Sequence, residues 1–227
     1  MRILAVSDIH QSTRPHRGID ESNNFAKFLK VVKKESPDLI LICGDTENIT
    51  NGDIRDLKKT NIKTFIILGN HDIPQIIMNS GMFIDGVQEF NGVIISGISG
   101  IVSPSKRDYV LKFPKETIIS KSNMIGQDLT RLKKRLDILM THEMPRVHYR
   151  FEDRFYDVRS SSVFGDVLYL LKPKLAISGH LHGNETLVAN YEYGTLINLG
   201  AFTDGHYAII EAKENPFEIN KIVPVDF

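Results

Sequence analysis

The sequence predicts an α/β protein built on two β-sheets. Three observations predict this fold class: short continuous apolar runs closed by polar residues, helical stripes between these runs, and a C-terminal part of short strands separated by turns. Continuous apolar runs rich in β-branched residues are typical of strands buried on both faces. With 227 residues, 41% of them hydrophobic, the chain can bury a sizeable core. We expect one domain over residues 1–227.

The N-terminal third alternates strands with a helix. The apolar runs at residues 2–7, 38–43 and 63–68 are short enough to be strands and end in polar residues. Between the first two, residues 24–35 place apolar side chains at helical spacing, and Pro37 ends that helix. The order strand, helix, strand favours parallel pairing.

The same alternation returns in the middle of the chain. Residues 93–97 form an apolar run that predicts a strand. Residues 122–135 carry an apolar stripe typical of a helix and precede a predicted strand at 137–141. A second helix at 161–171 precedes a strand at 174–178.

The C-terminal quarter has a different character. Short apolar segments alternate there with Asn, Gly and Pro turns, which favours antiparallel strands. The expected strands lie at residues 185–189, 194–198, 206–212 and 218–223.

Composition excludes several classes of protein. The 28 basic side chains balance 28 acidic ones, which argues against a generally basic nucleic-acid binder or a polybasic membrane protein. The single cysteine, Cys43, excludes an internal disulfide framework and a four-cysteine zinc site, and its place in a buried strand predicts a small core residue. No apolar run reaches about 18 residues. We expect a cytoplasmic protein without a membrane partner, and homo-oligomerisation stays open.

Metal-ligating residues follow the predicted strands. In open α/β sheets, ligands bind beyond the carboxyl ends of the strands. Imidazole, carboxylate and amide ligands suit Mn, Fe, Zn and similar divalent ions. Turn chemistry would place Asp, Asn and Gly at such corners but does not explain five histidines there. The seven candidate ligands are Asp8, His10, Asp45, Asn70, His142, His180 and His182.

Seven ligands exceed what one tetrahedral ion needs. If one carboxylate bridges, each of two ions can receive four protein ligands. The sequence therefore predicts two divalent metal ions.

Five short motifs in this order resemble the calcineurin-like metallophosphoesterase family. The resemblance runs from Met1 to about Gly200. It implies a β-sandwich of two mixed sheets flanked by helices, an α/β/β/α arrangement. The motifs are Asp8-Ile-His10, Gly44-Asp45, Gly69-Asn70-His71-Asp72, Thr141-His142 and Gly179-His180-Leu181-His182.

The resemblance also implies a role for each ligand. Asp45 would bridge the two ions, and His71 would be the catalytic histidine near the leaving group. Manganese is the first expectation for both ions, with Fe, Ni, Co and Zn as alternatives. Asp8, His10 and His182 would complete the first ion's ligands, and Asn70, His142 and His180 the second's.

Two positions depart from the family pattern. Many relatives carry an acidic residue three positions past the metal-binding Asp, followed by Arg. This chain has Asn48 and Ile49 there, which weakens the case for a phosphoprotein phosphatase. Glu47 and Asp72 are the candidates for orienting His71 instead.

Two arginine-containing segments near the site invite a second interpretation. Residues 145–159 interleave four arginines with four aromatic residues, a pattern that can grip phosphates and stack bases. Residues 14–17 carry two further arginines just past the first metal corner. For residues 145–159 we favour a solvated loop or an oligomer contact, and a solvated loop explains residues 14–17 at least as well, so no substrate-binding residue is assigned.

The predicted function is hydrolysis of phosphate esters. Hydroxide bridging two metal ions would attack phosphorus, and His71 would assist the leaving group. Phosphodiesters or small phosphorylated metabolites and nucleotides are expected as substrates, in preference to phosphoproteins. One alternative is a non-catalytic scaffold, which has no need to keep His71. A nuclease is the other, and nucleic acid is not the favoured partner at zero net charge.

Overall fold

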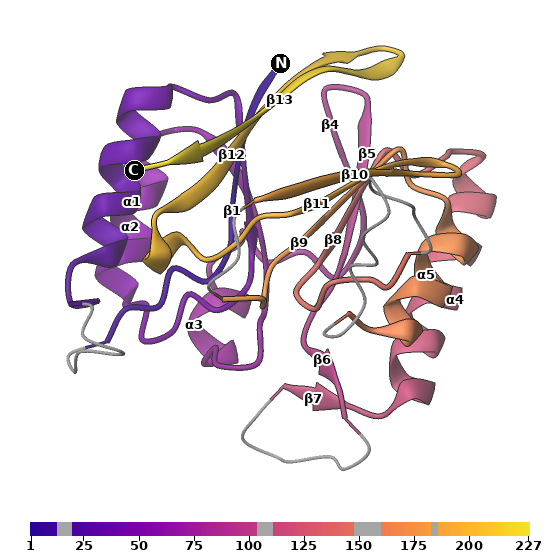
Figure 1. The fold of residues 1–227 in the computed structure, drawn as a ribbon, viewed down its shortest axis with the longest axis horizontal. Coiled ribbons are helices and arrows are strands. Elements are labelled where there is room, and N and C mark those ends of the chain that lie inside the picture. The colour runs from indigo at the N-terminus through magenta and orange to yellow at the C-terminus, as the bar shows by residue number, and fades with distance from the viewer. Residues whose placement is uncertain (13–19, 104–110, 148–159, 183–185) are drawn as a thin grey trace, which may run out of the picture.

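Two β-sheets pack face to face, with helices on both outer faces (Figure 1). The structure is a computed structural model that describes residues 1–12, 20–103, 111–147, 160–182 and 186–227. This arrangement confirms the predicted α/β sandwich of two mixed sheets flanked by helices. No helix in the described ranges is long and apolar enough to cross a membrane.

The first sheet has three parallel strands and two antiparallel ones. Strands β1, β2 and β3 run parallel, whereas β12 pairs antiparallel with both β1 and β13. Helices α1 (Asn24–Glu35) and α2 (Asn51–Lys59) cover its outer face (Figure 1). The strand order is β13 (Phe217–Asp226), β12 (His206–Glu214), β1 (Arg2–Val6), β2 (Leu39–Cys43) and β3 (Lys63–Ile67).

The second sheet has a parallel centre and antiparallel edges. Strands β11, β9, β8 and β5 run parallel, and β10 and β4 pair antiparallel at the two edges. Helices α4 (Lys115–Leu132) and α5 (Ser162–Leu171) cover its outer face (Figure 1). The order is β10 (Leu187–Tyr191), β11 (Gly194–Asn198), β9 (Leu175–Ser178), β8 (Ile138–Thr141), β5 (Val93–Ile98) and β4 (Gly86–Phe90).

Several short elements lie outside the two main sheets. Helix α3 (Pro74–Met78) follows β3, and the short strands β6 (Ile101–Val102) and β7 (Lys112–Phe113) pair parallel outside the main sheets. The 3₁₀ turn η1 (Phe202–Asp204) leads into β12.

Alternation along the central strands explains why they read as continuous apolar runs. Successive side chains of a strand point to opposite faces of the sheet. Ile3 and Ala5 of β1 lie in the cluster between the two sheets, whereas Leu4 and Val6 pack with the helices outside. All four side chains are fully buried. A strand with two buried faces therefore needs an apolar residue at every position.

The structure corrects several predicted boundaries. The helix expected at residues 122–135 begins at Lys115 and ends at Leu132, because Lys133 adopts a left-handed conformation and its N–H bonds to carbonyls of the last turn. Helix α2 was not predicted, although Thr50 and Asp53 form a capping box at its start. Strand β4 and helix α3 were also missed. The prediction of antiparallel C-terminal strands is confirmed for the pairs β10–β11 and β12–β13, but β11 also pairs parallel with β9.

Candidate metal centre

The loops that follow β1, β2, β8 and β9 meet at one edge of the sandwich. The N–H of Asp8 donates to Gly44, and the N–H of Gly179 donates to His142, both at 3.0 Å. Across the two sheets, the N–H of His180 donates to Oδ2 of Asp8 at 2.8 Å. These bonds place residues from distant parts of the chain around one point.

Asp8, His10 and His182 form the first candidate metal group. One possible ligand atom of each lies within 4.8 Å of the others. Nε2 of His182 lies 3.0 Å from Nε2 of His10 and 3.2 Å from Oδ1 of Asp8. Asp8 and His10 are buried, and His182 is half-buried.

Asp45, His142 and His180 form the second group, under the same distance limit. Nε2 of His142 lies 3.2 Å from Oδ2 of Asp45 and 3.2 Å from Oδ1 of Asn70. The rings of His142 and His180 are 5.1 Å apart. The structure therefore brings all seven predicted ligands together.

Asp45 lies between the two groups. Its Oδ2 atom is 3.2 Å from Nε2 of His142 in the second group and 4.0 Å from Nε2 of His10 in the first. Its Oδ1 atom accepts the backbone N–H of His71 at 2.8 Å. This position suits a carboxylate shared by two ions.

Four of the seven candidate ligands have strained backbones. The φ angles of Asp8, His10, Asp45 and His180 are +55°, +39°, +53° and +70°. Side-chain-bearing residues rarely adopt this left-handed region, and such strain concentrates at functional sites. The loops therefore keep these side chains in place at an energetic cost to the fold.

The lone pairs of the second group fit a metal ion. Nδ1 of His142 lies 2.8 Å from the carbonyl oxygen of Cys43, which can only accept, so Nδ1 carries the proton. In the neutral ring, Nε2 then presents a lone pair to the oxygens of Asp45 and Asn70. Several acceptors facing one another without a donor are satisfied by a cation.

The first group shows the same feature. Glu47 lies 2.8 Å from Nδ1 of His10 and can accept its proton, which turns a lone pair on Nε2 toward His182. Among the described residues, Oδ1 of Asp8 is buried without a hydrogen-bond partner. Nitrogen and oxygen ligands of this kind suit a divalent ion such as Mn, Fe, Ni, Co or Zn.

Without a metal, protons take its place. Burial opposes a charge on His142, but the Asp45 carboxylate overcomes it and raises the pKa of the ring to about 10. Burial also opposes a charge on His10, and Asp8 and Glu47 raise its pKa to about 10. Burial and the positive charge of His142 lower the pKa of His180 to about 4. Metal binding must therefore displace protons from His10 and His142.

His71 lies beside the centre and is exposed. Its ring is 5.7 Å from the ring of His10. Neither candidate for orienting His71 hydrogen-bonds its ring in the described structure: Glu47 bonds His10, and Asp72 bonds backbone amides. Asn48, which stands where many relatives carry an acidic residue, donates to the backbone carbonyl of Gln11.

Asp72 links the loop that follows β2 to the loop that follows β3. Its buried carboxylate accepts the backbone N–H groups of Asp45, Thr46, Glu47 and Gly69 and the hydroxyl of Thr46, at 2.7 to 3.1 Å. Burial and the neighbouring charge of Asp45 raise the pKa of Asp72, and these donors oppose that shift. The sequence singled out this residue, but for a different role.

Some sequence observations lie outside the described residues. These are the arginines at 14 and 17 and most of the Arg/aromatic segment, residues 148–159. Cys43 is buried as expected, and burial raises the pKa of its thiol.

Comparisons with known proteins identify the family of this chain. A family model described as calcineurin-like phosphoesterase matches residues 1–184. Lariat debranching enzyme A of Xenopus laevis is 24% identical, with 74% of this chain and 41% of that protein covered. The Homo sapiens lariat debranching enzyme is 25% identical, with 71% and 40% covered. The chain thus spans about two fifths of the length of these relatives.

Solved structures share the fold. A Thermus thermophilus protein superposes with a TM-score of 0.72 at 16% identity, covering 99% of this chain and 98% of that one. A calcineurin-like phosphoesterase of Bacillus subtilis superposes with a TM-score of 0.58 at 12% identity, covering 99% and 89%.

Proposed function

The chain belongs to the calcineurin-like phosphoesterase family, and from this premise we propose that it hydrolyses phosphate esters with two divalent metal ions. We propose phosphodiesters or small phosphorylated nucleotides and metabolites as substrates, in preference to phosphoproteins. The observation that carries the proposal is the pair of three-residue ligand groups on either side of Asp45.

In this proposal, Asp45 contributes to both ions. When bound, such ions activate water near neutral pH and polarise phosphoryl oxygens, and manganese is our first expectation. Asp8, His10 and His182 would hold the first ion, and Asn70, His142 and His180 would hold the second.

The ligand chemistry favours an anionic substrate. Asp8 and Asp45 are the two carboxylates of the set, and the other five ligands are neutral when they bind a metal. Two divalent ions bring four positive charges against two negative ones. The protein therefore leaves a surplus of positive charge at the position of the phosphate.

We assign the leaving-group proton to His71. The backbone N–H of this residue is held by Asp45, and its exposed side chain stands beside His10. A protonated imidazole there can donate to the departing alkoxide oxygen as general acid.

The residue at position 49 favours diesters over monoesters as substrates. Ile49, where many relatives carry arginine, is only 3% exposed and packs in the apolar cluster under α1 and α2. That position supplies no cation for the extra charge of a monoester. The match to lariat debranching enzymes supports the same substrate class.

A chromogenic assay tests the proposal. With Mn²⁺, the protein should release p-nitrophenol from bis-p-nitrophenyl phosphate faster than from p-nitrophenyl phosphate. Asp45→Ala should abolish both turnover and loading of the second ion, whereas His71→Ala should lose turnover and keep its metal. His206→Ala is the control, because His206 pairs with Asp226 away from the centre. Full metal loading without turnover of any mono- or diester would refute catalysis and leave the scaffold alternative.

A further inference from the structure

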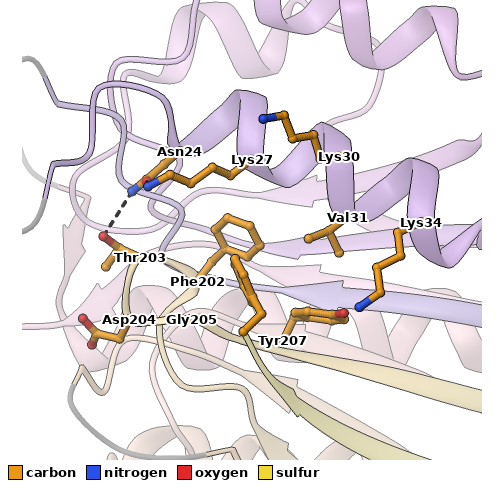
Figure 2. Close-up of a pocket in the computed structure, with 11 residues that line it drawn as sticks. Asn24, Lys27, Lys30, Val31, Lys34, Phe202, Thr203, Asp204, Gly205 and Tyr207 are labelled. Atoms are coloured by element: carbon orange, nitrogen blue, oxygen red, sulfur yellow. Dashed lines mark hydrogen bonds between the residues drawn. The ribbon is translucent and has the colours of Figure 1, made fainter.

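A cavity of about 530 Å³ lies between α1 and the segment formed by η1 and β12. One wall carries three lysines of α1, Lys27, Lys30 and Lys34, and the other carries aromatic side chains that include Phe202 and Tyr207 (Figure 2). Ligand-binding clefts commonly have this volume. It is separate from the seven metal ligands.

The three lysines form a row. Positions three and four apart lie on one face of a helix, and all three residues line the cleft. From Lys27 to Lys34 the row extends about 10 Å along the helix axis, at 1.5 Å per residue. A row of this length suits consecutive phosphates of a chain better than one isolated phosphate.

The ammonium groups at the two ends of the row have contacts within the protein. Nζ of Lys27 donates to Oδ1 of Asn24 at 3.1 Å and to the carbonyl of Asp20 at 3.4 Å. Lys34 lies 3.5 Å from Glu35, but that carboxylate already accepts from Arg2 and Tyr207. The Lys34 side chain is 67% exposed, so its ammonium group stays accessible from the cleft. Asp204 is the one acidic residue in the lining, against three lysines. The cleft is therefore cationic.

An aromatic surface faces the lysines. The ring of Phe227 packs 5.0 Å from Phe202 and 5.6 Å from Tyr207, and Phe227 is 57% exposed. Phe202 and Tyr207 are almost fully buried, so they support the exposed ring from beneath. Exposed aromatic rings beside a basic row are the elements that bind single-stranded nucleic acid, by stacking and by phosphate contacts.

Hydrogen bonds connect one end of the cleft to the loop that carries Asp8 and His10. The buried side-chain amide of Asn24 donates to the carbonyls of Ile9 and His10, both at 2.9 Å, and to Thr203 at 3.1 Å. The N–H of Thr203 in turn donates to the carbonyl of Asp8. The lysine row thus starts next to the loop of two proposed metal ligands and runs away from it.

We propose that this cleft binds a single-stranded nucleic-acid segment that continues from the phosphodiester at the metal centre. The lysines contact phosphates, and Phe227 stacks on a base. This inference rests on the proposed function for the substrate's reactive end, but binding in the cleft can be measured without turnover.

The test is fluorescence anisotropy with a labelled deoxythymidine oligonucleotide of about 12 residues, checked for integrity after each titration. The full chain with Lys27→Gln, Lys30→Gln and Lys34→Gln should bind roughly 10- to 100-fold more weakly at 0.1 M salt. The slope of log K against log salt should fall by about 2, since each phosphate contact on a single strand contributes about 0.7. Phe227→Ala should weaken binding roughly tenfold and leave that slope unchanged.

A matched triple variant controls for net charge. Lys33→Gln, Lys58→Gln and Lys221→Gln remove the same charge from exposed positions outside the cleft and should leave the salt slope within about 0.7 of the original. Equal losses in the two triple variants, or no loss in either, would overturn the proposal. Displacement of the oligonucleotide by free mononucleotide at equal phosphate concentration would also overturn it. Failure of the proposed catalysis would appear differently, as absent turnover with binding intact.

Discussion

Replacing Asp72 by asparagine should cost the protein much of its stability. Oδ2 of Asp72 accepts the N–H groups of Asp45 at 2.9 Å and Gly69 at 2.8 Å, while Oδ1 accepts the remaining three donors. In the Asp72→Asn variant, an amide nitrogen must replace one oxygen. If it replaces Oδ2, two buried backbone donors lose their acceptor and face another donor. The opposite rotamer is worse, because three donors then lose theirs.

The size of the effect follows from that count. Leaving a buried donor unsatisfied costs about 1–3 kcal/mol. Two such donors lower the free energy of unfolding by about 2–6 kcal/mol, a large part of the 5–15 kcal/mol typical of a domain. The metal loops should also loosen, because the two donors belong to the segments that carry Asp45 and Asn70.

Urea denaturation followed by circular dichroism, with a chelator present, measures this loss without a metal contribution. Asp56→Asn is the control, because that exposed side chain accepts from the also exposed Lys59 at the protein surface, and its unfolding curve should match that of the unmodified protein. If Asp72→Asn lowered the free energy of unfolding by less than about 1 kcal/mol at an unchanged denaturant slope, the proposed stabilising role of the Asp72 carboxylate would be refuted.

Three further predictions concern the metal centre. Glu47→Ala should lower the affinity for Mn²⁺ about 10- to 100-fold in calorimetric titration, because His10 loses the partner that orients it, and Glu47→Gln should recover most of the loss. The metal-free protein should lose stability as pH rises: His10 and His142 have folded pKa values of about 10 against about 6.5 unfolded, so their contribution is complete below pH 6.5 and disappears toward pH 10. A denaturation midpoint that stays constant or rises over this range would contradict it. Gly179→Ala should prevent folding or metal binding, because a Cβ there would collide with Ser7 and with the Asp8 carboxylate; a soluble variant with normal metal content would show that the loop can move aside.

The sequence predicted the candidate ligand set because local chemistry marks it. Each ligand closes or closely follows an apolar run, and parallel strands bring such ends to one edge of a sheet. The motif Gly179-His180-Leu181-His182 therefore indicates two candidate ligands from the sequence alone. The α/β class was equally visible, because strands buried on both faces leave continuous apolar runs such as Leu39–Cys43.

The sequence could not predict hydrogen bonds between side chains and main-chain amides. Asp72 was a candidate for orienting His71, but its carboxylate bonds main-chain amides of the neighbouring loop, and amides carry no sequence signature. Helix α2 was missed because only two of its nine residues are buried, so its apolar stripe is too short to recognise.

The sequence by itself determined which residues could hold the metal ions and on which class of fold they would lie. Only the tertiary structure decided that Glu47 pairs with His10, that Asp45 lies between the two groups, and that the lysines of α1 face Phe202 and Tyr207 across a cleft. The physical reason is the separation along the chain of the residues that interact. Strand runs and turn residues are set by neighbours along the chain, whereas these pairings join segments up to about 180 residues apart, whose approach depends on how two sheets and their helices pack.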